Sequence, residues 1–135
     1  MKKVKSIIAT AVFAVVFSIG AFAQTEPKII AVVNQAEWCS VCKANGQRAM
    51  GVFMENNREG TISLVVNDVT SAETKKKSAT GLSTNGLTDA MKNYKAAGVL
   101  YFFEAKTKKP ITQVTVANSN EEIAYVMGEV KKAVK

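Results

Sequence analysis

One short segment, Trp38-Cys39-Ser40-Val41-Cys42-Lys43, constrains what this chain can fold into more than any other. It contains both cysteines of the sequence and lies between an apolar run, 29–33, and a stretch from 40 to about 57 whose composition predicts a helix. The first N–H groups of a helix have no partner within it, and the positive end of the helix dipole lies there. A thiol at that place has a lowered pKa, so the segment predicts a reactive cysteine.

The spacing of the two cysteines also allows them to form a disulfide. Residues three apart on a helix share a face, with about 5–6 Å between their Cβ atoms, so a bridge needs only a small adjustment. A disulfide is the usual fate of two cysteines in an exported protein. The residues alone leave open whether such a bridge would be redox-active or only structural.

The first residues have the pattern of an export signal. Lysines within the first five residues precede an apolar run, 7–17, and the cleavage pattern Ala21-Phe22-Ala23. We therefore predict a signal peptide over 1–23, cleavage after Ala23, a single domain over 24–135 and a periplasmic or secreted location. The alternative is an uncleaved membrane anchor, although the apolar stretch is at the short limit for a bilayer span. The sequence has no cysteine near the cleavage site that could carry a lipid.

Composition excludes several classes of site. The sequence contains no histidine, which rules out Ser-His and Cys-His catalytic pairs, a histidine-ligated haem and histidine-containing zinc or copper sites. The formal net charge of +7 is partly due to the leader, and aromatic residues are not interleaved with lysines. The pattern therefore gives no support for binding to nucleic acid.

The apolar pattern predicts strand, helix, strand, helix, strand, strand, helix. We expect the first helix to bury Ala49, Met50, Phe53 and Met54, and the stretch 70–86, with its run of lysines, to be a partly helical surface excursion. The first three elements imply a right-handed parallel crossover, and the last two strands must be antiparallel. The expected strands are 29–34, 61–67, 99–103 and 111–117, and the expected helices are 40–57, 87–97 and one that starts at the Ser119–Glu122 capping box.

The segment Ala36-Glu37-Trp38-Cys39-Ser40-Val41-Cys42-Lys43 resembles the active-site segment of the thioredoxin-like family, W-C-x-x-C-K after a buried strand and before a helix. The element order from about residue 28 to 134 is also similar to that of the family's core. The resemblance implies an α/β fold with a four-stranded mixed sheet in the order 2-1-3-4 and helices on both faces. It also implies an extracytoplasmic protein disulfide oxidoreductase.

The resemblance assigns roles to individual residues. Cys39 would be the exposed attacking thiolate and Cys42 the buried resolving thiol, while Trp38, Gly98 and Val99 would line the substrate groove. It implies no cofactor and no metal. The expected partners are protein thiols and disulfides, with a membrane electron donor as a further candidate, and the expected state is a monomer without stable membrane insertion after cleavage.

The sequence departs from the family at three places. The buried acid of the preceding strand is replaced by Val32 or Val33, depending on the count. The proline beside the active site, cis in the family, is replaced by Gly98, or by Leu100 in another alignment, and we expect a trans bond there. Gln47 stands where relatives have a helix-kinking proline. Without the acid, we expect slow resolution by the second cysteine.

Two other functions remain open at this point. A non-catalytic binding protein could carry a purely structural disulfide, although closing so short a loop stabilises a fold by only about 2 kcal/mol. A metal or iron–sulfur site would need a dimer, with Cys39 and Cys42 contributed twice. The sequence does not fix the direction of disulfide exchange.

Overall fold

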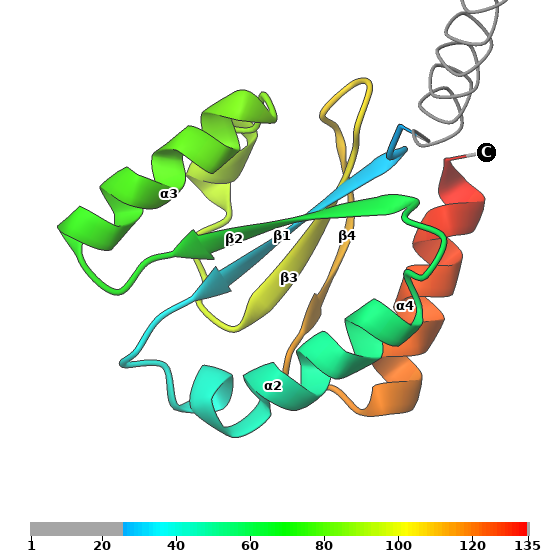
Figure 1. The fold of residues 1–135 in the computed structure, drawn as a ribbon, viewed down its shortest axis with the longest axis horizontal. Helices are drawn as coiled ribbons and strands as arrows, with labels where there is room; N and C mark the ends of the chain where they lie inside the picture. Colours follow the sequence, from blue (N-terminus) through cyan, green and yellow to red (C-terminus); the bar gives the residue numbers. More distant parts are fainter. Residues whose placement is uncertain (1–25, 135) are drawn as a thin grey trace, which may run out of the picture.

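Four strands form one mixed sheet in the order β2-β1-β3-β4, as the family resemblance implies (Figure 1). The computed structural model describes residues 26–134, so the predicted signal peptide lies outside the described residues. β1 and β2 are parallel because α2 (Ser40–Glu55) connects them across one face of the sheet, and β3 is antiparallel to both of its neighbours. The strands are β1 (Ile29–Gln35), β2 (Ile62–Asp68), β3 (Val99–Glu104) and β4 (Pro110–Thr115).

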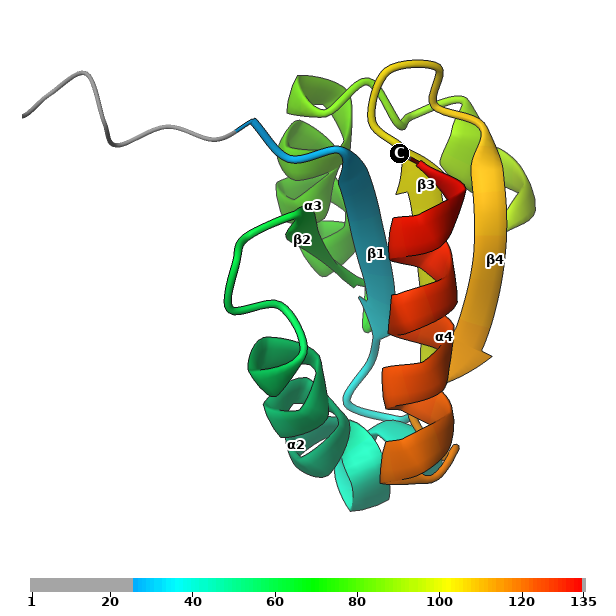
Figure 2. The same cartoon turned by 90° about the vertical axis from the view of Figure 1, so that its right-hand side faces the viewer.

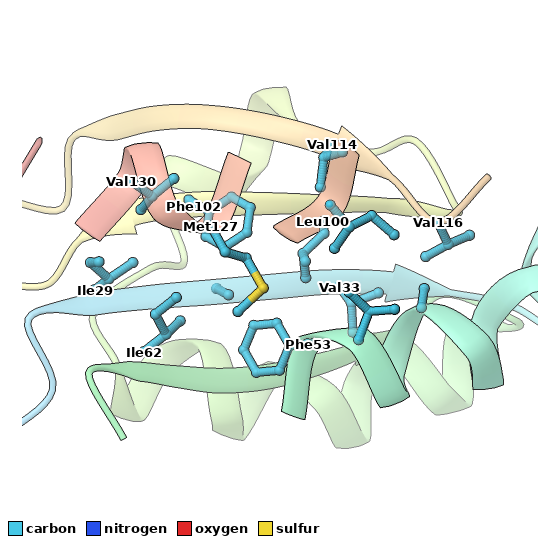
Figure 3. Packing of buried hydrophobic residues seen from close by; sticks show 14 residues of the cluster. Ile29, Val33, Phe53, Ile62, Leu100, Phe102, Val114, Val116, Met127 and Val130 are labelled. Carbon is cyan, nitrogen blue, oxygen red and sulfur yellow. The ribbon is translucent and has the colours of Figure 1, made fainter. Parts of the chain in front are cut away.

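The larger hydrophobic core lies between one face of the sheet and the helices α2 and α4 (Asn120–Ala133) (Figure 2). In Figure 3 the side chain of Met127 extends from α4 toward the ring of Phe53 in α2, beside Phe102 of β3. All three side chains are buried. This packing fixes the start of α2 relative to the end of β1, where the cysteines lie.

A smaller core covers the opposite face of the sheet. It is completed by α3 (Ala72–Thr84) and by the 3₁₀ turn η2 (Ala90–Asn93), and Leu87 and Met91 are buried in it. The expected arrangement of helices on both faces is therefore confirmed.

The stretch 70–86 is partly helical and lies on the surface, as expected, since α3 begins with a capping box between Ser71 and Thr74 and has no buried residue. Two other helix predictions are wrong. The stretch 87–97 forms only η2 followed by an irregular loop, because tertiary hydrogen bonds hold the carbonyl groups of Tyr94 and Ala96 outside a helix. Met54, expected in the core, is 66% exposed, because Val52 takes a place on the buried face of α2.

Within residues 26–134, no helix combines the length and the hydropathy that a bilayer crossing requires.

Candidate functional site

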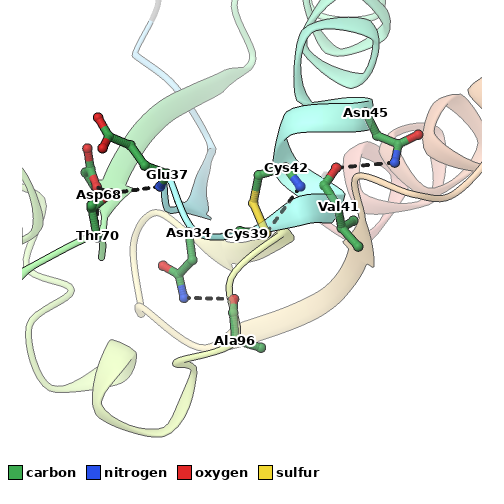
Figure 4. Close-up of a disulfide and its surroundings, with 9 residues drawn as sticks. All are labelled: Asn34, Glu37, Cys39, Val41, Cys42, Asn45, Asp68, Thr70 and Ala96. Atoms are coloured by element: carbon green, nitrogen blue, oxygen red, sulfur yellow. Dashed lines mark hydrogen bonds between the residues drawn. A yellow bond between two sulfur atoms is a disulfide. The ribbon is translucent and has the colours of Figure 1, made fainter.

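Cys39 and Cys42 form a disulfide at the start of α2, with 5.2 Å between their Cα atoms. Cys39 is the N-cap of the helix, with an extended backbone, and its Sγ accepts a hydrogen bond from the backbone N–H of Cys42 at 3.2 Å (Figure 4). This is an N–H group that the helix itself cannot satisfy. In the reduced protein the same donor and the helix dipole would favour negative charge on Cys39.

The two cysteines border different spaces. Cys39 lines an open groove together with Trp38, Gly98 and Val99, the residues that the resemblance assigned to a substrate groove. Cys42 lines a separate cavity of about 290 Å³ between α2 and the sheet. The disulfide therefore separates a surface groove from a chamber that reaches into the larger core.

The expected exposures of the two cysteines are wrong for the disulfide form. Cys39 is only 8% exposed, whereas Cys42 is partly exposed. The reason is geometric, because the N-cap sulfur of Cys39 folds back over the first turn and lies beneath the loop that contains Gly98. Cys42 lies inside the helix and faces the cavity.

The cavity beside Cys42 contains no candidate proton acceptor. Apart from Cys42 itself, its described lining consists of apolar and neutral polar residues, with Val33 among them. Val32 belongs to the core on the opposite face of the sheet. Glu37 is exposed, and Figure 4 shows its carboxylate directed away from the disulfide. The structure therefore offers no substitute for the family's buried acid among the residues that line this cavity.

Gly98 lies beside the disulfide, and the side of its Cα atom where a side chain would stand faces both sulfurs. A Cβ atom built on it would be 3.5 Å from Cys39 Sγ and 3.6 Å from Cys42 Sγ. Its φ angle is +81°, and its N–H donates to the carbonyl oxygen of Asn34 at 2.7 Å. Proline can adopt neither feature, because its φ is fixed near −65° and it lacks the N–H. Leu100, the other alignment candidate, is buried in β3.

The backbone beside the disulfide is trans, as the sequence predicts, since none of the peptide bonds in the described part of the chain is cis. The loop before β3 is therefore a different structural solution from a cis-proline loop. It uses a left-handed glycine and a backbone hydrogen bond to β1 instead.

Trp38 is 63% exposed and is held at the mouth of the groove by the loop after β2. Its indole N–H donates to the carbonyl oxygen of Thr70 at 3.1 Å, and the N–H of Glu37 donates to Thr70 Oγ1 at 3.0 Å. Thr70 in turn donates its hydroxyl and its N–H to Asp68, and these bonds hold the pKa of the Asp68 carboxyl below its usual value. Sequence reasoning missed both Thr70 and Asp68.

Arg48 ties α2 to the loop between β4 and α4. Its guanidinium donates to the carbonyl oxygens of Val116 and Asn118 at 2.9 and 3.0 Å, and to the side-chain oxygens of Asn45 and Asn120. The contact holds the first half of the helix next to the strand end that lines the groove. No local pattern marks this residue, because an arginine on a helix ordinarily reads as a solvent-facing charge.

The residues that the structure describes contain no group of three or more histidine, cysteine, aspartate or glutamate side chains arranged to hold a metal ion.

No protein-family model matches the sequence, and no curated protein is a detectable relative. Solved structures do match in fold. A putative protein disulfide isomerase from Bacteroides thetaiotaomicron is 16% identical with a TM-score of 0.51, and the alignment covers 79% of this chain and 74% of that one. The protein Trxlp from Edwardsiella tarda is 12% identical with a TM-score of 0.50, with 82% and 91% covered.

A thioredoxin from Malassezia sympodialis is 16% identical with a TM-score of 0.50, and 76% of each chain is covered. At these identities the likeness shows the fold. The sheet order, the crossover through α2 and these three structures together lead to one conclusion: the chain has the thioredoxin-like fold, with its two cysteines joined where β1 leads into α2.

Proposed function

We propose that this protein is a thiol–disulfide oxidoreductase that acts on other proteins outside the cytoplasm. The observation that carries the proposal is the position of Cys39 Sγ, which accepts the N–H of Cys42 at the start of α2 and borders an open groove. The same sulfur therefore has a donor that stabilises its thiolate and a surface on which a partner can be bound.

The exchange would begin with attack of the Cys39 thiolate on one sulfur of a partner disulfide. The partner's S–S bond breaks, its second sulfur leaves as a thiolate that takes up a proton, and Cys39 is joined to the partner by a mixed disulfide. Cys42 then loses its proton and attacks Cys39 Sγ. The mixed disulfide breaks, the partner leaves with two thiols, and two electrons have passed from the cysteine pair to the partner.

The groove indicates what kind of segment it would take from the partner. Its lining is neutral throughout, with Trp38 at one side and small residues at the other; it consists of Trp38, Cys39, Ser40, Val41, Ala97, Gly98, Val99, Thr115 and Ala117. A groove of this type favours an extended segment with uncharged side chains around the reacting cysteine.

The neutral cavity beside Cys42 makes the second step the slower one. Resolution requires Cys42 to lose its proton, and the cavity lining provides neither a base nor a charge that favours the thiolate. We infer that the mixed disulfide accumulates during turnover at neutral pH.

The export pattern supports the extracytoplasmic part of the proposal. Residues 1–23 would be removed after Ala23, and the mature protein would act as a monomer on protein thiols and disulfides, with a membrane protein as a candidate electron donor. Mass spectrometry of the exported protein tests this directly, since the mature chain should begin at Gln24. A mature chain that still starts at Met1 would contradict it.

The activity itself is tested by reduction of insulin with dithiothreitol as the electron source. The wild-type protein should accelerate precipitation of the insulin B chain, and Cys39→Ser should abolish the acceleration. A folded wild-type protein with no effect on insulin or on other disulfide proteins would instead favour a binding protein with a structural bridge. The reduction potential then gives the direction, with about −270 mV indicating a reductase and about −120 mV an oxidase.

A further inference from the structure

Asn34 is the one polar side chain that is buried among the described residues, with 0% of its surface exposed. It is at the end of β1, five residues before Cys39, on the face of the sheet that carries the smaller core. A buried carboxamide is costly unless its donors and its acceptor are all paired. Its partners therefore show what the residue is for.

Every hydrogen bond of the Asn34 side chain goes either to the backbone of the loop before β3 or to a side chain of the neighbouring strand β2. Its Nδ2 group donates to the carbonyl oxygen of Tyr94 at 2.9 Å. It also donates to the carbonyl oxygen of Ala96 at 3.2 Å, the bond drawn in Figure 4. Its Oδ1 atom accepts from Nδ2 of Asn67, the residue that faces it across the parallel strand pair, at 2.9 Å. Asn67 thus fixes which way the Asn34 amide is turned, so that both donors point at the loop.

The loop that Asn34 holds is the one that lies on the disulfide. The backbone oxygen of Asn34 accepts the N–H of Gly98, so one residue makes three hydrogen bonds to the segment 94–98. A Cβ atom on Gly98 would be in van der Waals contact with both sulfurs, and Gly98 and Ala97 form one wall of the groove. η2 ends at Asn93, so this segment has no regular secondary structure of its own.

We propose that Asn34, oriented by Asn67, is a positioning residue that fixes the 94–98 loop against the Cys39–Cys42 pair and thereby sets the shape of the substrate groove. This inference rests on the proposed exchange activity. In this loop a left-handed glycine stands where a proline ring would otherwise restrict the backbone, and the Asn34–Asn67 pair holds the loop instead.

If the proposal is correct, release of the 94–98 loop should slow exchange with a protein disulfide but not the reaction with a small reagent. If the loop is released, the groove loses one wall, and a protein disulfide is no longer aligned with Cys39. At the same time water reaches the sulfurs, which favours the thiolate and therefore the reduced pair. A small reagent that needs no groove should then react at least as fast as before.

The experiment compares Asn34→Leu and Asn67→Leu with the matched control Ile30→Val, which lies on the same face of β1 and makes no side-chain hydrogen bond to the loop. Asn34→Leu keeps the branched shape of the side chain and removes its donors and its acceptor. Asn67→Leu is at a partly exposed position and removes only the bond that orients the amide, so it provides the test if Asn34→Leu does not fold.

Three quantities are measured on the full-length mature protein: the rate with insulin, the alkylation rate of Cys39 by iodoacetamide, and the equilibrium of the cysteine pair with dithiothreitol. In the asparagine variants the insulin rate should fall by about tenfold or more, as small misplacements at a reacting centre do. The alkylation rate should not fall, and the equilibrium should move by about three- to tenfold toward the dithiol. Ile30→Val should leave all three within about twofold of wild type.

A purely structural role for Asn34 would leave the insulin rate and the equilibrium unchanged in both asparagine variants while their stability drops, and this result would overturn the proposal. An insulin rate of zero in the wild type would overturn the proposed activity instead. The equilibrium with dithiothreitol and the alkylation rate can still be measured in that case, so the two failures are distinguishable.

Discussion

The two cysteines of this protein are three residues apart, yet their surroundings are opposite in character. Cys39 accepts a backbone hydrogen bond at the start of a helix and borders an open groove that Trp38 flanks. Cys42 borders a cavity with a neutral, mostly apolar lining in which Val33 occupies a wall. The difference teaches that the fold prepares one sulfur to carry negative charge and provides the other with no help in losing its proton.

The largest expected effect comes from removing either sulfur. Cys39→Ser should lower disulfide exchange by at least about a thousandfold, as loss of a nucleophile does. In the Cys42→Ser variant, Cys39 should still attack a partner disulfide and then remain joined to the partner, because no second thiol can release it. Non-reducing gel electrophoresis separates the two outcomes. A covalent complex formed by Cys39→Ser through Cys42 would reverse the assignment of roles.

The missing proton acceptor can be supplied by Val33→Asp, which places a carboxyl group in the wall of the cavity that Cys42 lines. General-base help contributes about 10²–10⁴-fold where geometry is favourable, so the mixed disulfide should be resolved at least about tenfold faster. Acid quenching at timed intervals, followed by mass spectrometry, measures the lifetime of the mixed disulfide.

Val33→Asn is the matched control for this change, since it has the same shape and a similar polarity but cannot accept the proton. Equal lifetimes of the mixed disulfide in Val33→Asp, Val33→Asn and wild type would show that proton removal from Cys42 does not limit the second step.

Gly98 provides a test of the loop that forms one wall of the groove beside the sulfurs. Gly98→Ala should lower the free energy of unfolding by about 1–2 kcal/mol, because a residue with a Cβ atom is strained at φ +81°. Gly98→Pro should cost more, because it also removes the N–H donated to Asn34. Urea denaturation measures both changes. A Gly98→Pro variant that is as stable as wild type would show that this loop readily accepts the proline geometry.

The smallest effect is expected at the support of Trp38. Hydrogen bonds from Thr70 lower the pKa of Asp68 in the folded protein, so its contribution to stability is fully present above the ordinary aspartate pKa of about 3.8. The contribution is lost as the pH falls through the lowered value. Asp68→Asn should therefore be less stable than wild type at pH 7, and the two curves should converge toward pH 2.

Thermal unfolding of both proteins from pH 7 to pH 2 measures this difference in stability. The contributions of the other carboxylates that titrate in the same range are common to both proteins and cancel in the difference. A stability difference that stays constant across the whole range would show that the Asp68 charge is not what holds the Thr70 turn.

Features that depend on residues close together in the chain could be predicted from the sequence. The continuous apolar run predicted β1, the Ser119–Glu122 capping box predicted the start of α4, and the Trp-Cys-x-x-Cys segment gave the place of the disulfide. The sheet order followed from the family resemblance of that segment. Each of the three patterns depends on residues that are close together in the chain, so the pattern and the structure carry the same information.

Features decided by contacts between distant residues could not be predicted. The bounds of α3 could not be predicted for a different reason: it has no buried residue and so leaves no apolar stripe, and its capping box uses Thr74 in place of an acid. The stretch after Leu87 has helical spacing, but Asn34 captures the carbonyl groups of Tyr94 and Ala96 from 60 residues away or more. The exposures of the cysteines likewise depend on the Gly98 loop that lies over Cys39.

The most direct measurement is the pH dependence of alkylation of each thiol in the reduced protein, with the modified cysteine identified by mass spectrometry. We expect Cys39 to titrate with a pKa below the value of about 8.5 for free cysteine, and Cys42 at or above it. If both thiols titrate like free cysteine, or if Cys42 ionises first, the asymmetry between the two sulfurs is absent and the proposed order of attack and resolution is wrong.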